Sequence, residues 1–587
     1  MNNPYFSLIR TVWSYGAPWR GSIVGYYSAY VIAQVCLGLS PYAFGRTIDV
    51  LQNFKPENLS QVIFWLGIGV LVLLLFWVFH GPARVVERKV ALKIQQAFRL
   101  NFYEQLTRLP LKWHQDHHSG NIITRLNRAS VALYRFAETQ FLYIETIIKF
   151  LVSICFLLWI SLPVGLLTLL TSIIVAVTII IFDRKLIPLY SAQNEIDNHA
   201  GAVLFDYVNN MTTVLTLRLG ESTHMNLFQR LMSVWPFFRK DIVLNEIKWF
   251  TMMMILSVVQ SLILIGYIML TLNSTGAIMV GAVVMIFRYQ WDISSVFYEL
   301  SSYYSEVVRM DTDIKGLNPI IEDIRHFAHL PQGAATARQW HTLNIHSLTF
   351  NHSSTDKRAK IFDNLSFSIK RGEKIALIGT SGGGKSTLLN ILSGLYTASH
   401  VNLIIDGIGF DSLEPLQAIT TLIPQDPEIF ENTIAFNITM DLPTEQAEID
   451  RVIQLAGFWD VLMSLPLGLD TDIREKGQNF SVGQKQRLAL ARGLFAARFS
   501  SLILMDEPTS SVDLPTEKEI LFGVIRAFPE AAMIVSLHRL HLLQKFDSVI
   551  MLSKGTVVAS GPTAELLNTP GPVYDLWQAY QRDFDAE

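Results

Sequence analysis

The sequence predicts an all-α membrane domain of six spanning helices that extend into the cytoplasm, followed by a soluble α/β domain. Half of the 587 residues are hydrophobic, and the mean hydropathy of +0.31 is high for a soluble protein. These apolar residues concentrate before about residue 300, in runs long enough to cross a bilayer. From Leu343 onward, short apolar runs alternate with helical patterns, which is typical of an α/β domain.

The domain boundaries are placed where this composition changes. Residues 1–20 hold tryptophan and arginine among apolar residues, which predicts a short helix lying in the membrane interface. We expect the six-helix domain over residues 21–315, a linker over 316–342 and the α/β domain over 343–580.

The six spans follow from the lengths of the apolar runs. A spanning helix needs about 20 mostly apolar residues, and two of the runs are too long for one helix. One breaks at Leu162-Pro163 and the other at residues 272–276, both of which are turn signals. The expected spans are residues 21–47, Gln61–His80, the two halves of Phe150–Phe182 and the two halves of Phe250–Tyr289.

Basic residues predict the orientation of these spans. They gather between the second and third spans and between the fourth and fifth, whereas Lys55 is the only clear basic residue of the short loops. The positive-inside rule then places both long stretches, both termini and the C-terminal domain in the cytoplasm. Apolar residues recur at helical spacing in Val90–Leu109 and Val203–Leu217, so we expect the helices to continue beyond the bilayer.

Charge and cysteine content exclude other classes of protein. The net charge of -3 gives no support for a surface that binds nucleic acid. Cys36 and Cys155 each lie in an apolar stretch, so we expect two small buried side chains and neither a disulfide nor a zinc site.

A phosphate-binding loop is predicted after the strand Lys374–Gly379. The pattern G-x-x-x-x-G-K-[ST] follows that strand directly and precedes the helical run Leu388–Leu395. Its backbone N–H groups would cradle phosphate oxygens, Lys385 would reach the β- and γ-phosphates, and the Ser386 hydroxyl would bind Mg²⁺. The nucleotide-binding residues expected here are Gly379, Thr380, Ser381, Gly382, Gly383, Gly384, Lys385, Ser386 and Thr387.

Two carboxylates end a second predicted strand, Leu502–Met505. Asp506 is placed to hold Mg²⁺, and Glu507 is the expected general base that orients and activates the attacking water. Adjacent carboxylates at a strand end can instead cap a helix, but the phosphate loop in the same chain favours catalysis.

Taken together, these residues resemble the ATP-binding cassette family. Phe480-Ser481-Val482-Gly483-Gln484 is similar to the family signature L-S-G-G-Q, and Ser481 and Gln484 also fit a capping box at a helix start. The resemblance implies that this helix start contacts ATP held by the phosphate loop of a partner chain. The nucleotide contacts implied are Ser481, Gly483 and Gln484.

Further family elements follow in the expected order. The resemblance implies that Gln425 senses metal and water, that His538 contacts the γ-phosphate and that Asp513 lies on the loop crossing to the opposite ATP site. Glu475 matches the acidic position of an exporter-specific loop. The implied catalytic residues are Glu507, His538 and Gln425, and the implied Mg²⁺ ligands are Ser386, Gln425 and Asp506.

The chain departs from the family pattern at two positions. His352 stands where an aromatic residue usually stacks on adenine, and Val482 stands where the signature has glycine. Imidazole can also stack, so His352 is kept as an expected adenine contact. Neither change touches Lys385, Gln425 or Glu507, so we expect an active ATPase.

The order of the two domains resembles exporter-type half-transporters. It implies short coupling helices near Lys112–Ser119 and Asn209–Thr216, the second docked on the partner's cassette. The implied activity is ATP-driven export or flipping of a lipid, drug, peptide or other amphiphile, by a homodimer or with a related half-transporter. An importer of the same architecture and an ATP-switched regulatory or channel-like protein are the alternatives. Because the N-terminus shows no transit peptide, we expect the bacterial cytoplasmic (inner) membrane.

Four ionisable residues lie at membrane depth in the predicted spans. Glu145 and Lys149 are four residues apart on the third span, as are Arg288 and Asp292 on the sixth. The favoured interpretation is two ion pairs, each within one helix. The alternative is a polar lining for a cavity that admits a polar or zwitterionic substrate.

Overall fold

The computed structural model describes residues 3–117, 119–327, 339–351, 361–380, 382–426, 428–474, 477 and 479–584. The chain divides into two compact units. The first comprises Met1–Leu109 and Asp116–Ala328, and the second comprises Pro110–Gln115 and His329–Glu587. The predicted order of a helical membrane domain and an α/β domain is confirmed.

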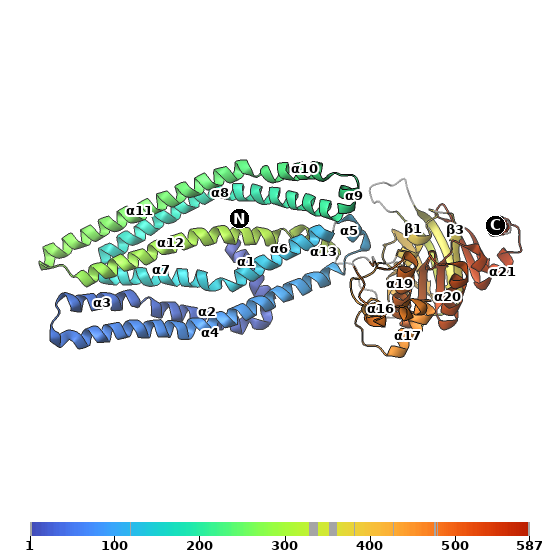
Figure 1. Ribbon diagram of the computed structural model, residues 1–587, viewed down its shortest axis with the longest axis horizontal. Helices are drawn as coiled ribbons and strands as arrows, with labels where there is room; N and C mark the ends of the chain where they lie inside the picture. The colour runs from blue at the N-terminus through green and yellow to red at the C-terminus, as the bar shows by residue number, and fades with distance from the viewer. Residues whose placement is uncertain are drawn as a thin grey trace. The chain divides into compact units, whose positions relative to one another are not determined.

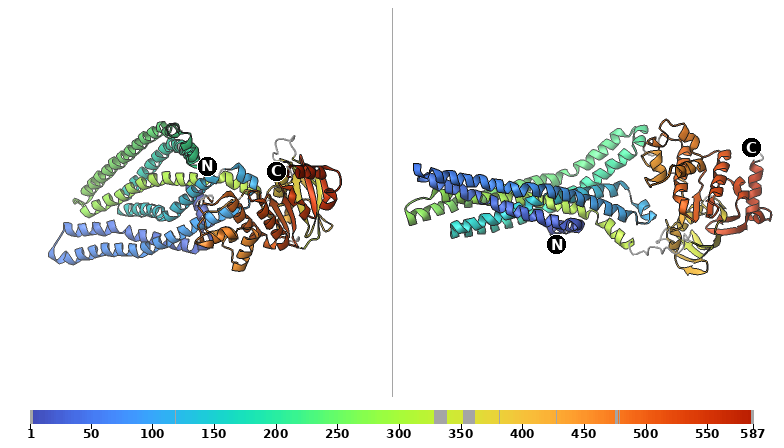
Figure 2. Two further views of the ribbon diagram at one scale, coloured as in Figure 1. Left: turned by 45° about the vertical axis from the view of Figure 1, so that its right-hand side comes forward. Right: turned by 90° about the horizontal axis from the view of Figure 1, so that it is seen from below.

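Long helices build the first unit (Figure 1). Helices α8 and α11 lie side by side, as do α2 and α4 (Figure 2). In chain order the helices up to the α/β domain are α1 (Pro4–Tyr15), α2 (Arg20–Leu37), α3 (Ser40–Gln52), α4 (Leu59–Leu106), α5 (Leu111–Asp116), α6 (Ser119–Glu138), α7 (Gln140–Ile160), α8 (Leu162–Asn209), α9 (Met211–Thr216), α10 (Gly220–Met232), α11 (Trp235–Thr275), α12 (Val280–Lys315) and α13 (Asn318–Phe327).

Both predicted turns between spans are confirmed. Ser161 is extended between α7 and α8, and Pro163 occupies the first turn of α8, where its missing N–H costs nothing. Gly276 is left-handed at the end of α11, with φ of 67°. The first span differs from the prediction, because residues 21–47 are divided between α2 and α3. Pro41 at the start of α3 cannot continue the preceding helix, since it has no N–H to donate.

In the part of the chain that the structure describes, five helical stretches are long and apolar enough to cross a membrane. They are Ala17–Gln52, Pro56–Leu106, Ser119–Ile160, Leu162–Asn209 and Gly220–Asn273. The sixth expected span, α12, is not among them, because Arg288, Gln290 and Asp292 make its apolar stretch more polar. One face of α12 is nevertheless buried against α7, α8 and α11 through residues that include Ile286 and Tyr289.

Several of these helices are longer than a bilayer is thick. Helices α4 and α8 have 48 residues each, which at about 1.5 Å per residue is more than twice a hydrocarbon core of about 30 Å. The predicted helical extensions are thus confirmed. Two short helices, α5 and α9, lie at the turns that follow α4 and α8, close to the expected coupling positions (Figure 1).

The described residues of the second unit form two sheets. A four-stranded sheet has the order β2-β1-β4-β5 and a six-stranded sheet has the order β10-β9-β3-β8-β7-β6. The strands are β1 (Thr342–Phe350), β2 (Phe362–Lys370), β3 (Lys374–Gly379), β4 (His400–Ile405), β5 (Ile408–Phe410), β6 (Thr420–Ile423), β7 (Leu502–Asp506), β8 (Ala532–Ser536), β9 (Ser548–Ser553) and β10 (Thr556–Pro562). The helices are α14 (Lys385–Leu392), α15 (Glu414–Gln417), α16 (Ile434–Thr439), α17 (Gln446–Leu455), α18 (Trp459–Met463), α19 (Val482–Ala496), α20 (Leu514–Ala527), α21 (Thr563–Leu566) and α22 (Pro572–Phe584).

Parallel pairing in the larger sheet brings the predicted motifs to one edge. Strands β6, β7, β8 and β3 are parallel neighbours in that order. Ile375 and Leu377 belong to one hydrophobic cluster and Ala376 and Ile378 to another, so both faces of the sheet are covered. The carboxyl ends of parallel strands meet at one edge, which is where α/β proteins bind ligands.

Candidate active site

The phosphate loop leaves the carboxyl end of β3 and enters α14. At its start Gly379 passes so close to Leu552 that an added Cβ would lie 2.1 Å from the Leu552 carbonyl oxygen. At its end Gly384 has φ of 101°, and an added Cβ would lie 2.9 Å from the Phe362 ring. Only glycine fits at either position. Ser381 lies outside the described residues, and Thr380, Gly382 and Gly383 complete the loop.

Three predicted phosphate and metal contacts begin α14. Lys385 Nζ donates a hydrogen bond to the Gly379 carbonyl oxygen at 3.1 Å, so the ammonium lies over the loop. Ser386 and Thr387 follow in the first turn of the helix. A helix N-terminus carries partial positive charge and free N–H groups, so loop, lysine and helix start together form a site for phosphate.

The three residues predicted to be catalytic follow the three strands next in the sheet, β8, β7 and β6. Glu507 directly follows β7, and its Oε2 accepts a hydrogen bond from Gln425 Nε2, beyond β6, at 3.0 Å. Glu507 has φ of 45°, a left-handed conformation that costs a residue with a side chain about 1–3 kcal/mol. His538 is exposed after β8, at the same edge of the sheet. The structure thus brings Gln425 and Glu507 into contact and places His538 one strand away from Glu507.

The residues predicted to hold Mg²⁺ fit that ion chemically. Asp506 is only 7% exposed, and its Oδ1 is buried without a hydrogen-bond partner among the described residues. Such an atom is costly to bury unless a ligand satisfies it. Ser386, Gln425 and Asp506 offer the hydroxyl, amide and carboxylate oxygens that Mg²⁺ prefers. When bound with ATP, the ion would neutralise phosphate charge.

The predicted capping box at the signature is confirmed. Ser481 Oγ accepts from the Gln484 N–H at 3.3 Å, and Gln484 Oε1 accepts from the Ser481 N–H at 2.9 Å. Val482 is the first residue of α19 and is 65% exposed, so its side chain does not disturb the helix start. Gly483 lies so close to the following loop that an added Cβ would be 2.9 Å from the Ser511 carbonyl oxygen.

Asp513 is the N-cap of α20, at the end of the loop that follows β7. Its Oδ2 accepts hydrogen bonds from the side chain and the N–H of Thr516, at 3.0 and 3.2 Å. These hydrogen bonds lower the pKa of Asp513 below its usual range. Its carboxylate is therefore ionised and caps α20. The other two predicted positions near the nucleotide, His352 and Glu475, lie outside the described residues.

Sequence reasoning missed a group of polar residues behind this site. Gln486 and Arg539 each hydrogen-bond the loop between β7 and α20, and Glu517 pairs with Arg539 at 2.9 Å. The only available signal was their position, because Gln486 lies five residues after Ser481 and Arg539 follows His538.

The ionisable residues of the membrane unit pair across helices, so the favoured sequence interpretation is wrong for α7. Glu145 Oε1 lies 2.8 Å from His80 Nδ1 of α4, and Lys149 Nζ lies 2.6 Å from Glu299 Oε1 of α12. Side chains on facing helices were closer than the neighbours four residues along the same helix. A further buried pair joins Lys248 of α11 to Asp183 of α8 at 3.3 Å.

The other pair expected within one helix is also absent. Arg288 is exposed and Asp292 is partly buried, and no ion pair joins them in the described part of α12. The two cysteines differ from expectation as well, since Cys36 is partly exposed and Cys155 is exposed. Both thiols are free. Apolar residues on a membrane helix can face outward, so an apolar stretch does not predict burial there.

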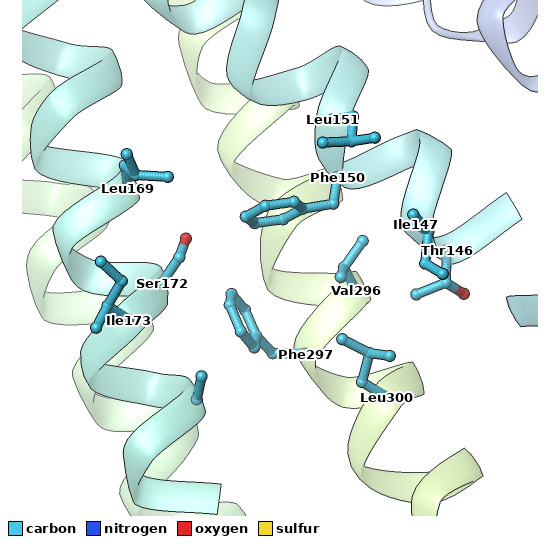
Figure 3. Close-up of a pocket in the computed structure, with 11 residues that line it drawn as sticks. Thr146, Ile147, Phe150, Leu151, Leu169, Ser172, Ile173, Val296, Phe297 and Leu300 are labelled. Carbon is cyan, nitrogen blue, oxygen red and sulfur yellow. The ribbon is translucent and has the colours of Figure 1, made fainter. Parts of the chain in front are cut away.

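An apolar cavity of about 390 Å³ lies between α7, α8 and α12 (Figure 3). Phe150 and Phe297 point into the space between the helices. Thr146 lines the cavity, and its hydroxyl donates to Glu299 Oε2 at 2.8 Å, so the Lys149–Glu299 pair lies beside it. The full lining is Thr146, Ile147, Phe150, Leu151, Leu169, Ser172, Ile173, Ala176, Val296, Phe297 and Leu300.

Comparison with known proteins places both units in one family. The family model described as ABC transporter matches residues 362–510, and the model of the ABC transporter transmembrane region matches residues 25–291. A solved bacterial Atm1-family ABC exporter with ATP bound shares the fold, with a TM-score of 0.78, 23% identity and coverage of 96% of this chain and 98% of that one.

The curated relatives are named for different transported substrates. The ATM1-type heavy metal exporter of Novosphingobium aromaticivorans is 25% identical over 578 residues, 95% of this chain and 92% of that protein. The mitochondrial iron-sulfur clusters transporter ABCB7 of Oryzias latipes is 30% identical over 313 residues, 52% of this chain and 41% of that protein. The ATP-dependent lipid A-core flippase of Pseudomonas aeruginosa is 32% identical over 278 residues, 46% and 45% of the two chains. The chain therefore spans less than half the length of the last two.

The two family models match in the order in which the structure places a helical membrane unit and an α/β unit with a phosphate loop. The multi-pass helices, the phosphate loop and the signature helix all fall within one chain. The chain belongs to the ABC transporter family, as an exporter-type half-transporter that joins a membrane-spanning domain to a nucleotide-binding domain.

Proposed function

We propose that this chain hydrolyses ATP to export or flip an amphiphile across a membrane. The observation that carries the proposal is the hydrogen bond between Gln425 and Glu507, at the same edge of the sheet as the phosphate loop. A site that only bound nucleotide would need the loop but not a fixed carboxylate at this edge. Here Glu507 orients and deprotonates the attacking water, Lys385 stabilises charge on the phosphates and His538 contacts the γ-phosphate.

The working unit is a dimer. Ser481 is exposed and is the N-cap of α19 with a complete capping box, so the remaining N–H groups of the helix start and the helix dipole are available to a phosphate. We assign Ser481, Gly483, Gln484 and Asp513 to nucleotide held by a partner chain. A second copy is the simplest partner, because one chain carries every catalytic residue type. A related half-transporter is the other possible partner.

Two features of the membrane unit support the proposed substrate class. The Lys149–Glu299 pair is partly exposed, with 22% and 27% of the side chains accessible, and lies beside an apolar cavity of about 390 Å³. Ionisable groups at membrane depth mark substrate pathways, and cavities of this size suit small ligands. A molecule with an apolar chain and a zwitterionic or polar head satisfies both features.

The chain's relatives favour outward transport. They are named exporter, transporter or flippase, so an importer is not favoured, and the fixed Glu507 argues against an ATP switch without turnover. We place the protein in the bacterial cytoplasmic membrane, with the ATPase domain inside. Residues 110–115, which include most of helix α5, group with the α/β unit, and this supports a coupling role for α5.

Transport in vesicles of known sidedness tests the proposal. In inside-out vesicles the ATPase domains face the outer solution. Mg-ATP would be added to that solution together with fluorescent single-chain amphiphiles that carry zwitterionic, anionic or neutral heads. We expect ATP-dependent movement away from the cassette side, favouring the zwitterionic head. Movement toward that side would establish an importer, and hydrolysis without movement of any probe would contradict amphiphile transport.

A further inference from the structure

Gln486 uses its whole side-chain amide on the segment that follows β7. It lies in α19 and is 5% exposed. Its Nε2 donates to the Glu507 carbonyl oxygen at 3.1 Å and to Ser510 Oγ at 3.0 Å. Its Oε1 accepts from the Ser511 N–H at 2.9 Å. A buried amide with this many partners fixes the path of the backbone that it contacts.

That backbone includes the strained residue of the site. The left-handed conformation of Glu507 persists only if its surroundings impose it. Gln425 holds the Glu507 side chain. Gln486 and the Ser510 N–H, at 3.1 and 3.3 Å, hold its carbonyl oxygen. Gln486 therefore sets the direction in which the Glu507 peptide turns, and with it the direction of the carboxylate.

The first turn of α19 touches the same segment a second time. Gly483 lies against the Ser511 carbonyl oxygen with no room for a side chain. Gln486 binds the Ser511 N–H one turn further along the helix. A shift of the start of α19 is thus passed directly to the residues that follow Glu507.

Arg539, the residue after His538, holds the other side of this loop. Arg539 Nη1 donates to the Val512 carbonyl oxygen at 3.0 Å and pairs with Glu517, whose Oε1 accepts from Thr509 Oγ1 at 3.0 Å. With this side fixed, α19 is the element that can move the loop.

We propose that Gln486 is a positioning residue that aims Glu507 and couples its alignment to the start of α19. The inference deepens the proposed function, because in a dimer the start of α19 faces the partner's nucleotide. Occupancy of one ATP site would then align the catalytic glutamate that serves the other. Gln486 is buried and acts through the backbone that it contacts.

Two substitutions in the full-length protein in nanodiscs test this role. Gln486→Glu keeps the acceptor for the Ser511 N–H but loses the donor to the Glu507 carbonyl oxygen, whereas Gln486→Met loses both. We expect kcat to fall about 10- to 100-fold in each, as for a misaligned catalytic group. The Kd for ATP should stay within about 2-fold of wild type, because the phosphate loop is untouched. Gln454→Glu, on the exposed face of α17, is the matched control.

The pH profile separates positioning from a merely structural role. Burial raises the pKa of a carboxyl group, so the new glutamate should protonate as the pH falls toward 6 and regain an O–H donor for the Glu507 carbonyl. Relative to the wild-type kcat at the same pH, the kcat of Gln486→Glu should recover at low pH, whereas the kcat of Gln486→Met should not. An unchanged kcat, or equal pH profiles for the two variants, would overturn the inference. If the wild type still hydrolysed ATP, that result would leave the proposed function standing. An inactive wild type would overturn both.

Discussion

Replacing Gln425 by alanine tests the contact on which the proposed catalysis depends. The substitution removes the 3.0 Å hydrogen bond from Gln425 Nε2 to Glu507 Oε2. Hydrogen bonds to charged groups contribute about 1.5–3 kcal/mol, and the lower end applies because Gln425 is exposed. At about 1.36 kcal/mol for each factor of ten in rate, losing about 1.5 kcal/mol of alignment predicts a kcat roughly 10-fold lower.

The assay is steady-state ATP hydrolysis in nanodiscs, with kcat and KM measured separately. We expect the loss in kcat, because the contact orients the general base, and a KM for ATP close to wild type. Gln454→Ala removes an exposed amide on α17 and serves as the control. A kcat within 2-fold of wild type, or an effect confined to KM, would refute the proposal that Gln425 orients the catalytic Glu507.

Three further perturbations follow from other contacts. Lys374→Met leaves three carbonyl oxygens of residues 528–531 without their ammonium donor. Because an unsatisfied buried group costs about 1–3 kcal/mol, Tm should fall by several degrees. An unchanged Tm would contradict a stabilising role for these hydrogen bonds. Because hydrogen bonds depress the pKa of Asp513, its cap stabilises the domain above about pH 4 and is lost as the pH falls through the folded pKa; Asp513→Ala should lower Tm at pH 7, and the difference should shrink below pH 4. In a double-mutant cycle, Lys149→Met and Glu299→Gln should each abolish amphiphile-stimulated hydrolysis, and the double variant should recover part of it, because a lone charge is no longer left unpaired. Additive losses would contradict a coupled pair.

Local sequence signals predicted the elements that local interactions determine. Strand Lys374–Gly379 has the predicted bounds, and the turn at Ser161 lies one residue before the predicted Leu162-Pro163 break. The capping box of Ser481 and Gln484 was predicted from a spacing of three residues. Each feature depends on residues close in sequence, whose geometry is fixed by strand alternation, proline chemistry or helix caps.

Contacts between distant residues could not be predicted in the same way. Glu145 and Lys149 have the spacing of an intrahelical pair, yet they pair with His80 and Glu299, which are far away in sequence. Helix packing decides that outcome, and one sequence does not contain the packing angles. The role of Gln486 was missed for the same reason, because its partners lie 21–25 residues later in the chain.

The most direct test of the central claim is Mg²⁺-dependent ATP hydrolysis by the purified chain alone in lipid nanodiscs, compared with Glu507→Gln. The substitution keeps the size of the side chain but removes the base, and general-base catalysis contributes about 100-fold or more. We predict a hydrolysing wild type and a variant at least about 100-fold slower that still binds ATP. Equal rates would contradict the claim that Glu507 activates the water.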